Sequence, residues 1–554
     1  MKNKPVSLLL LLTILVLQSA CAQVLNHKKT FTHADTLRGS ITPQRGWWDV
    51  QRYDVQVQPQ FETKTIKGKT TITYVVLTDQ HADELQVDLQ APLQVDTIFY
   101  NGKVYVNYPG KPIRHEGAAY FIPLPKASKA SVQSVSIAYH GTPREAVNPP
   151  WDGGWIWKRD AAGRPWMSVA CQGLGASVWY PCKDHQSDEP DSGATLTIIV
   201  PDSLVAVGNG RLKNTIHTDS TATFTWEVKD PINNYNLIPY IGYYKNFAET
   251  YNGEKGALDC SYWVLDYNIE KAKAQFMQVP QMLKAFEWWF GPYPFYEDGY
   301  KLVESPHLGM EHQSAVAYGN KYGNGYLGQD LSGSGWGLKW DYIIVHESGH
   351  EWFANNITTK DIADMWVHEG FTDYAETLFT EYYYGREAAD AYLQGLRKNI
   401  QNDKTIIGTY GVNQEGSGDM YYKGANLLHT VRQVINNDSL FRNILRGLNT
   451  TFYHQTVTSK QVEAYISQQS KKDLAKVFDQ YLRATMIPVL ELHTEGTTLK
   501  YRWQNVIAGF NMPVKLTNGQ WLMPTANWKA AKLQTALPDS VSADTNFYIT
   551  VKKD

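Results

Sequence analysis

The sequence has little net charge and no basic run. Its 52 Lys and Arg nearly balance 55 Asp and Glu, which gives a formal net charge of −3 at pH 7 over 554 residues. Because phosphate backbones are recognised by clustered positive charge, nucleic acid is not an expected partner. The sequence also has no internal repeat of the length that solenoids use, which excludes that architecture.

Long hydrophobic runs are scarce as well, and the one present lies near the N-terminus. Two early lysines precede an apolar run over residues 8–17, and small residues follow at 19–22. This order is typical of an export signal, and the run is too short to span a bilayer. We therefore predict a signal peptide over residues 1–22, a periplasmic or secreted protein, and no transmembrane segment. A lipid anchor at Cys21 is the less favoured alternative, because Gln18 lies where lipoprotein signals normally have an apolar residue.

Cysteine is rare. Removal of the signal peptide would leave Cys171, Cys182 and Cys260. Because three thiols cannot all pair within one chain, at least one stays free or pairs between chains. The sequence is compatible with a Cys171–Cys182 disulfide and equally with small buried thiols.

Aromatic residues, in contrast, are abundant, with 18 Trp, 35 Tyr and 18 Phe. This abundance suits dense cores and aromatic-lined clefts, and it argues against extensive disorder. A chain of this length also exceeds what one core supports, so several domains are expected.

The sequence pattern changes along the chain and predicts a multidomain α+β fold. Residues 43–248 contain short alternating runs such as Ala194–Val200, which predict a large antiparallel β domain. Residues 249–486 show helical periodicity, as in Trp340–Asn355, and are expected to be mainly α. Alternation returns in residues 487–554, which predicts a small terminal β domain.

A glycine-rich stretch, Tyr318–Gly337, predicts a mobile loop. Such a loop is either a simple connector or a flap at the rim of a cleft. Its position between two motifs that contain candidate catalytic or binding residues, described next, favours the flap.

The first of these motifs is a metal-binding pattern. His346 and His350 are four residues apart, so on a helix both imidazoles project from one face and can hold one zinc ion. Glu347 follows the first histidine, in the position of a general base that reaches a water on the metal. Glu369 lies nineteen residues beyond His350, far enough for a second helix to return beside the first and supply a third ligand. A buried histidine pair or an exposed polar face is the alternative for the histidines alone, because the short pattern also arises by chance.

These residues carry a resemblance to a known family. The zinc pattern, with eighteen residues between His350 and Glu369, resembles the signature of the M1 family of zinc aminopeptidases. Trp352-Phe353 and Glu369-Gly370-Phe371 also match this family. The likeness covers residues 47–482. It implies a saddle-like β domain, a thermolysin-like zinc catalytic domain and a β-sandwich-like domain, with one zinc ion per chain. The long helical C-terminal domain of many members has no counterpart in the sequence.

The second motif precedes the zinc motif. The segment His307-Leu308-Gly309-Met310-Glu311-His312-Gln313 is similar to the family's Gly-x-Met-Glu-Asn motif, with His312 in place of Asn. By resemblance, Glu311 binds the substrate's α-amine, and the backbone of Gly309 and Met310 lines the substrate site. Gln172, some ten residues before a Pro-Cys-x-Asp segment, matches the family's second amine contact.

Further roles follow from position relative to these motifs. Tyr421 matches the first tyrosine of the family's Tyr-x-Lys-Gly motif, which stabilises the oxyanion, although Tyr422 is adjacent to it. Asp373 and Glu376, one and two turns after Glu369, are candidates to orient a ligand histidine. Surface salt bridges are the alternative for both carboxylates.

Together, these features predict a zinc-dependent aminopeptidase that acts on peptides with a free N-terminus. Glu347 would take a proton from the attacking water and deliver it to the leaving amine. A zinc endopeptidase, an epoxide hydrolase on the same core and a non-catalytic binding protein are the alternatives. Glu311 argues against the first, and the complete set of zinc ligands and base argues against the last.

Overall fold

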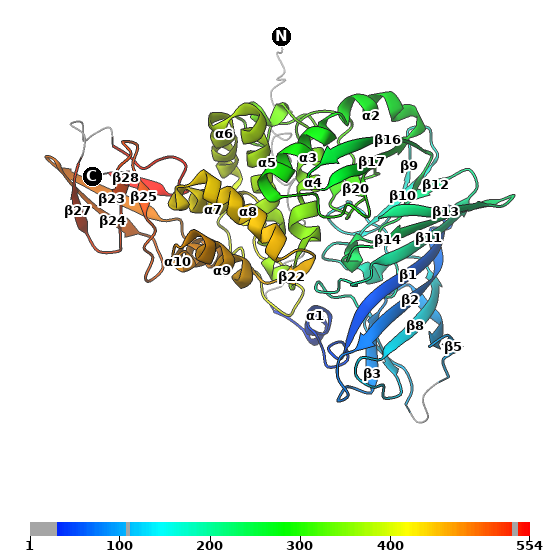
Figure 1. Cartoon of the computed structure of the whole chain (residues 1–554). Coiled ribbons are helices and arrows are strands. Elements are labelled where there is room, and N and C mark those ends of the chain that lie inside the picture. Colours follow the sequence, from blue (N-terminus) through cyan, green and yellow to red (C-terminus); the bar gives the residue numbers. More distant parts are fainter. Residues whose placement is uncertain (1–29, 107–110, 534–540, 554) are drawn as a thin grey trace, which may run out of the picture.

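The computed structural model describes residues 30–106, 111–533 and 541–553. Figure 1 shows a β-rich N-terminal part on one side of a helical middle part, and the C-terminal strands on the opposite side. This arrangement confirms the predicted α+β fold. The predicted signal peptide and Cys21 lie outside the described residues.

The N-terminal part is built on one eight-stranded sheet. Its central strand, β1 (Trp48–Gln60), pairs antiparallel with β2 (Thr65–Val76) and parallel with β11 (Ala194–Pro201). Alternate residues of β1 are buried, which gives the sheet one face on the core. The remaining strands of this sheet are β4 (Gln94–Tyr100), β5 (Lys103–Val104), β8 (Val132–Gly141), β13 (Arg211–His217) and β14 (Thr221–Val228).

Two smaller sheets complete the N-terminal part. One has the strand order β12 (Val205–Val207), β15 (Tyr240–Gly242), β10 (Pro165–Ala170) and β9 (Gly154–Arg159). The other has the order β3 (Glu84–Asp88), β7 (Ala119–Pro123) and β6 (Arg114–Glu116). The chain that leaves β10 carries Gln172 toward the middle part.

A short helix, α1 (His33–Gly39), precedes the first sheet and lies beside the middle part in Figure 1. Thr32 caps it through a reciprocal pair of hydrogen bonds with Asp35. The guanidinium of Arg45 is buried and donates to the carbonyls of Leu37, Arg38 and Ser40 at the end of this helix. These bonds satisfy carbonyls that a helix end otherwise leaves without a partner.

The middle part combines a five-stranded mixed sheet with a group of helices. The sheet order is β16 (Tyr244–Gly253), β17 (Gly256–Leu265), β18 (Tyr300–Glu304), β20 (Val316–Tyr318) and β19 (Gly309–Met310). The helices are α2 (Ile269–Gln275), α3 (Gln278–Phe290), α4 (Tyr342–Gly349), α5 (Trp366–Tyr384), α6 (Arg386–Leu396), α7 (Tyr422–Ile435), α8 (Asp438–Thr451), α9 (Ser459–Ser470) and α10 (Ala475–Arg483). A parallel pair, β21 (Ile357–Thr359) and β22 (Gln455–Val457), joins distant parts of this region.

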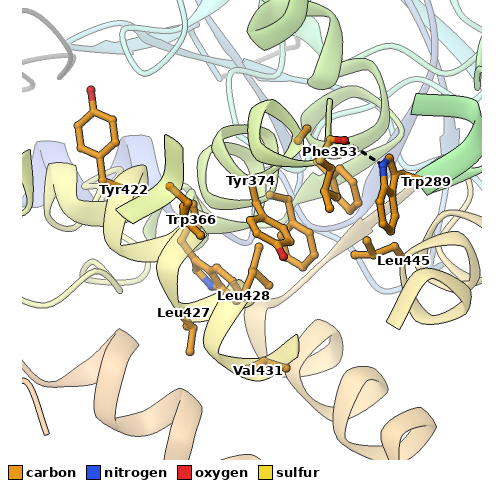
Figure 2. Close-up of a cluster of buried hydrophobic side chains, with 14 of the residues drawn as sticks. Trp289, Phe353, Trp366, Tyr374, Tyr422, Leu427, Leu428, Val431 and Leu445 are labelled. Carbon is orange, nitrogen blue, oxygen red and sulfur yellow. Dashed lines mark hydrogen bonds between the residues drawn. The ribbon is translucent and has the colours of Figure 1, made fainter. Parts of the chain in front are cut away.

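Helix α5 is central to this region and is buried along most of its length. Figure 2 shows Trp366 and Tyr374 of α5 near Leu428 of α7, with Phe353 and Trp289 beyond them. The indole of Trp289 donates to the carbonyl of Leu378 at 3.0 Å, which attaches α3 to α5. Packing of the hydrophobic core therefore fixes the position of α5.

Helix α4 begins at a defined cap and approaches α5 closely. The side chain of Asp341 accepts from the backbone N–H groups of Ile343 and Ile344. A Cβ atom at Gly349 would lie 3.1 Å from the Thr372 Cγ2 atom of α5. The glycine, a poor helix former, is thus explained by the close contact between the two helices.

The C-terminal part consists of one four-stranded and one two-stranded sheet. The first has the strand order β27 (Lys529–Lys532), β24 (Thr498–Gln504), β23 (Val489–Glu495) and β28 (Thr550–Lys553). The second pairs β25 (Val514–Lys515) with β26 (Trp521–Leu522). The hydroxyl of Tyr481 in α10 donates to the Tyr548 carbonyl at 2.7 Å and holds this part against the helices.

Cys171, Cys182 and Cys260 are free and buried. Burial raises the pKa of each thiol above its ordinary value. The buried-thiol alternative is therefore confirmed, and a Cys171–Cys182 disulfide is not formed. Within the described ranges, no helix is long and apolar enough to cross a bilayer.

Candidate metal centre and substrate cleft

Helices α4 and α5 bring the three predicted zinc ligands together. The Nε2 atom of His350 lies 3.3 Å from the Oε2 atom of Glu369, and that of His346 lies 3.8 Å from it. All three side chains are buried. Their nitrogen and oxygen atoms lie within 4.8 Å of one another, which is close enough for one ion to touch all of them.

The other ring nitrogens are engaged on the outer side. The Nδ1–H of His346 donates to Glu376 Oε1 at 2.6 Å, and the second oxygen of Glu376 accepts from the Tyr392 hydroxyl. The Nδ1–H of His350 donates to the Phe353 carbonyl at 3.1 Å. Because Nδ1 is the donor in each ring, both Nε2 lone pairs are available at the centre.

An irregular turn after α4 makes the second of these bonds possible. The chain forms a π-type turn over Glu351–Asn355, in which Phe353 and Ala354 leave helical geometry. Ala354 has a φ of +149°, a conformation that costs a non-glycine residue free energy. The turn directs the Phe353 carbonyl at the His350 ring.

The donor set fits zinc. Glu369 Oε2 is buried and has no hydrogen-bond partner among the described residues, so a cation is the ligand that its position calls for. Burial raises the pKa of this carboxyl, but the His350 and His346 imidazoles beside it outweigh burial and lower the pKa. Two imidazoles and one ionised carboxylate are a common ligand set of catalytic zinc.

Of the two predicted orienting carboxylates, Glu376 contacts a ligand histidine and Asp373 does not. Both Asp373 oxygens are buried without a hydrogen-bond partner in the described part of the chain. Burial, with a further contribution from Glu376, raises the Asp373 pKa well above its ordinary value. The prediction for Asp373 was wrong because the His346 ring directs its Nδ1 toward the residue two turns after Glu369, not one.

Glu347 lies in the cleft against the backbone of Gly309. A Cβ atom at Gly309 would lie 2.5 Å from Glu347 Oε1, so only glycine leaves room for the carboxylate. Burial raises the pKa of Glu347 to about 7, against the opposing effect of the neighbouring imidazoles. A pKa near neutrality suits a group that takes up and releases a proton.

Glu311 is held by residues from both the N-terminal and the middle parts. Its Oε1 atom accepts from the Gln172 amide and, at 2.9 Å, from the Tyr235 hydroxyl. Its backbone carbonyl accepts from the Asn355 amide at 2.7 Å, and Asn236 in turn donates to Asn355. Burial raises the pKa of Glu311 above its ordinary value. The predicted pair of Gln172 and Glu311 is therefore in direct contact.

Two residues at the site, Tyr235 and Asn355, were not predicted from the sequence. Asn355 lies five residues after His350, and its place in the turn that follows the zinc helix was a usable signal. Tyr235 lies in a 3-10 turn at Asn234–Asn236 and has no local signal, because its partner is 76 positions away.

The ambiguity between Tyr421 and Tyr422 is resolved by the start of α7. Tyr421 precedes the helix and lines the cleft, with its ring centroid 6.2 Å from that of His346. Tyr422 is the first helical residue and is not among the residues that line the cleft; Figure 2 shows it at the edge of the hydrophobic cluster. Lys423 donates to the Ala484 carbonyl and so faces the helical core.

One cleft gathers the predicted zinc ligands, the predicted base, the predicted substrate-binding residues and Tyr421. It is lined by Gln172, Gly309, Met310, Glu311, His346, Glu347, His350, Glu369 and Tyr421, and also by Pro150, Trp151, Leu308, Tyr326, Tyr342 and Ile343. Residues from the N-terminal part and from the middle part therefore form a single site.

The glycine-rich stretch reaches this cleft through Tyr326. The backbone of Tyr326 pairs with Gln329 in both directions, and Gly325 N–H donates to the Trp340 carbonyl. The Asn320 amide donates to Asp341, the cap of α4. Tyr326 alone of this stretch is among the cleft-lining residues, and hydrogen bonds fasten the stretch to the start of α4. Its movement as a flap stays a prediction.

Comparison with known proteins agrees with this geometry. Residues 278–481 match the model of the peptidase family M1 domain. The chain is 21% identical to leukotriene A-4 hydrolase of Xenopus laevis over 440 residues, which cover 76% of the chain and 68% of that relative. It is 22% identical to aminopeptidase N of Lactococcus lactis over 390 residues, which cover 66% of the chain but only 43% of that longer protein.

Solved structures show the same fold. An M1 zinc metallopeptidase from Deinococcus radiodurans superposes with a TM-score of 0.66 at 21% identity, over 79% of this chain and 93% of that one. A two-domain M1 zinc metallopeptidase bound to L-arginine gives a TM-score of 0.64, also at 21% identity, over 79% and 94% of the two chains.

Proposed function

We propose that the chain, whose residues 278–481 match the peptidase family M1 domain, is a zinc metallopeptidase that removes amino acids from the free N-terminus of peptides. One observation carries the proposal. The cleft that holds His346, His350 and Glu369 also holds Glu311, whose carboxylate is anchored by Gln172 and Tyr235.

The anchored carboxylate explains cleavage at a chain end. An ammonium group bound by Glu311 and Gln172 would supply the positive charge that a buried carboxylate otherwise lacks. With the ammonium held there, the peptide bond after the first residue is the one that reaches the metal centre. An endopeptidase needs no such anchor.

The chemistry is divided among the residues of the cleft. His346, His350 and Glu369 would hold the zinc ion, which when bound would act as a Lewis acid toward the scissile carbonyl and would lower the pKa of water. Glu347 accepts a proton from the attacking water on its carboxylate and donates it to the nitrogen of the leaving amine. The Tyr421 hydroxyl donates a hydrogen bond to the oxyanion of the tetrahedral intermediate.

The test compares free and N-acetylated aminoacyl anilides, with and without a zinc chelator. Cleavage of the free forms alone, abolished by the chelator, is the expected result. Cleavage of acetylated forms would make the protein an endopeptidase and remove Glu311 from its role. If neither form is cleaved by zinc-loaded protein, a lipid epoxide is the next substrate to assay, because one relative is named a leukotriene A-4 hydrolase.

Glu347→Gln tests the assignment of the base. We expect the variant to bind zinc as the parent does and to lose activity by about 10³-fold, since the amide cannot accept the water's proton. Metal analysis and kcat on the preferred anilide are the two measurements. Turnover equal to that of the parent would contradict the role of Glu347.

We propose further that the protein is exported after cleavage between Ala22 and Gln23. The order of charged, apolar and small residues at the N-terminus supports this. Cell fractionation and N-terminal sequencing of the mature protein test it. A diacylated N-terminal Cys21 would replace the secreted form by a lipid-anchored one.

A further inference from the structure

The loop that carries Gln172 is held at a single carbonyl from two sides. The Gly173 carbonyl accepts from Arg38 Nη2 of α1 at 3.3 Å and from the Asn413 amide at 2.9 Å. Gly173 has a φ of +71°, so this turn is one that glycine adopts without strain. The peptide next to Gln172 is therefore fixed by residues far away in the sequence.

Arg38 is itself anchored. Its Nη1 atom donates to Asp184 Oδ2 at 2.6 Å, and the same oxygen accepts from the Ser177 hydroxyl. A Cβ atom at Gly175 would lie 2.2 Å from Arg38 Nη2, so the guanidinium rests directly on the turn that follows Gln172. Asp184 is buried, and only a quarter of the Arg38 side chain is exposed.

The C-terminal end of helix α1 is fastened by contacts to two other parts of the chain. Arg45, which binds the carbonyls at the end of α1, forms an ion pair with Asp88 of β3 at 2.6 Å. At the same end of the helix, a Cβ atom at Gly39 would lie 2.1 Å from the backbone nitrogen of Asn413. The helix is thus wedged between the N-terminal sheets and the chain that leads to Tyr421.

We propose that α1 is a strap that positions Gln172 and that Arg38 is its positioning residue. Arg38 does not line the cleft, so it has no contact with substrate and acts through the Gly173 carbonyl. A misplacement of about 1 Å in a group that orients substrate can lower kcat/KM by up to about 10²-fold. The inference rests on the proposed function, because the position of Gln172 matters only if Gln172 binds the ammonium group.

The first experiment uses Arg38→Ala. We expect KM for free aminoacyl anilides to rise about tenfold while kcat changes less than twofold, since binding of the ammonium is weakened and the metal centre is not touched. Inhibition by an aminoacyl hydroxamate should weaken by a similar factor. Inhibition by the matching hydroxamate without the amine should stay the same. Arg38→Lys, which keeps the charge beside Asp184, should recover part of the loss.

Two controls separate positioning from general damage. Arg114→Ala removes an arginine that pairs with Glu84 in the same part of the molecule. Inhibition by either hydroxamate should be unchanged in this variant. In a Gln172→Ala background, Arg38→Ala should cause no further rise in KM. Equal weakening of both hydroxamates, or an undiminished effect in the Gln172→Ala background, would overturn the proposal.

If Arg38→Ala fails to fold, Asn413→Ala removes the other donor to Gly173 and should show the same selective pattern. Unchanged kinetics in that variant would also count against the strap. Failure of the proposed function is a different result, because the parent protein itself would then show no preference for a free amine.

Discussion

At the scale of single residues, the contact between Gly309 and Glu347 limits which side chains position 309 can accept. Gly309→Ala would place a Cβ atom 2.5 Å from Glu347 Oε1, so the carboxylate must move. We expect kcat to fall about 10²-fold with zinc retained. The measurement is kcat together with metal content. Gly323→Ala is the matched control, because its nearest neighbour would be 4.0 Å away; equal kcat in both variants would contradict the steric account.

Single residues were also where sequence analysis had its sharpest limits. His346, His350 and Glu369 follow a local pattern set by helix geometry, so the sequence alone brought them together. Tyr235 has no such pattern, because it meets Glu311 only after two separate regions of the chain pack together. The structure places the zinc ligands and Glu311 in one cleft, and the roles of these residues stay predictions until the variants are measured.

At the scale of helices, α5 supplies both a ligand and the residue that orients another ligand. Glu376→Gln should weaken zinc binding by about 10- to 100-fold, because His346 loses the carboxylate that fixes its ring. Competition with a chelator of known affinity measures this change. Asp373→Asn is the matched control on the same helix. The Asp373 side chain makes no hydrogen bond to any residue that the structure describes, so the zinc affinity of this variant should stay within about twofold of the parent. The opposite order of effects would restore the sequence-based assignment of Asp373.

Helix and strand patterns account for how much of the fold was predictable. Alternation in β1 and periodicity in α5 each report burial of one element against its neighbours, and both were evident in the sequence. Helix α1 was not predicted. It has seven residues, and its stability comes from Arg45 and from packing on Asn413, neither of which a local pattern reveals.

At the scale of the whole molecule, zinc should join α4 to α5 and so contribute to stability. Removal of the metal leaves Glu369 buried beside two histidines without the ion that compensates it. We expect the apparent Tm to fall by on the order of 5 °C on chelation and to recover on addition of zinc. Differential scanning calorimetry measures the shift. Glu347→Gln should show the same shift, since Glu347 is not a ligand, and an unchanged Tm would show that the metal adds no stability.

The cleft as a whole predicts a preference among N-terminal residues. Its described lining is apolar around Leu308, Met310 and Tyr326, and its acidic groups are those assigned to the amine, the base and the metal. We expect kcat/KM for a leucyl anilide to exceed that for an alanyl anilide by about tenfold or more, because extra methylene groups are buried. Tyr326→Ala should reduce this ratio and Tyr326→Phe should preserve it. A preference for aspartyl or lysyl anilides would contradict the prediction.

The buried thiols have a practical consequence for measuring motion in this protein. Cys171, Cys182 and Cys260 are inaccessible, with pKa values above the ordinary range, so thiol-directed dyes should not label them in the native state. A cysteine introduced at exposed Leu327, beside Tyr326, would therefore be a selective attachment point in the mature chain. A second at exposed Val147, in the loop that leads to Pro150 and Trp151 of the cleft lining, would complete a fluorescence pair near the cleft. Such a pair would report directly on whether the rim moves as substrate enters.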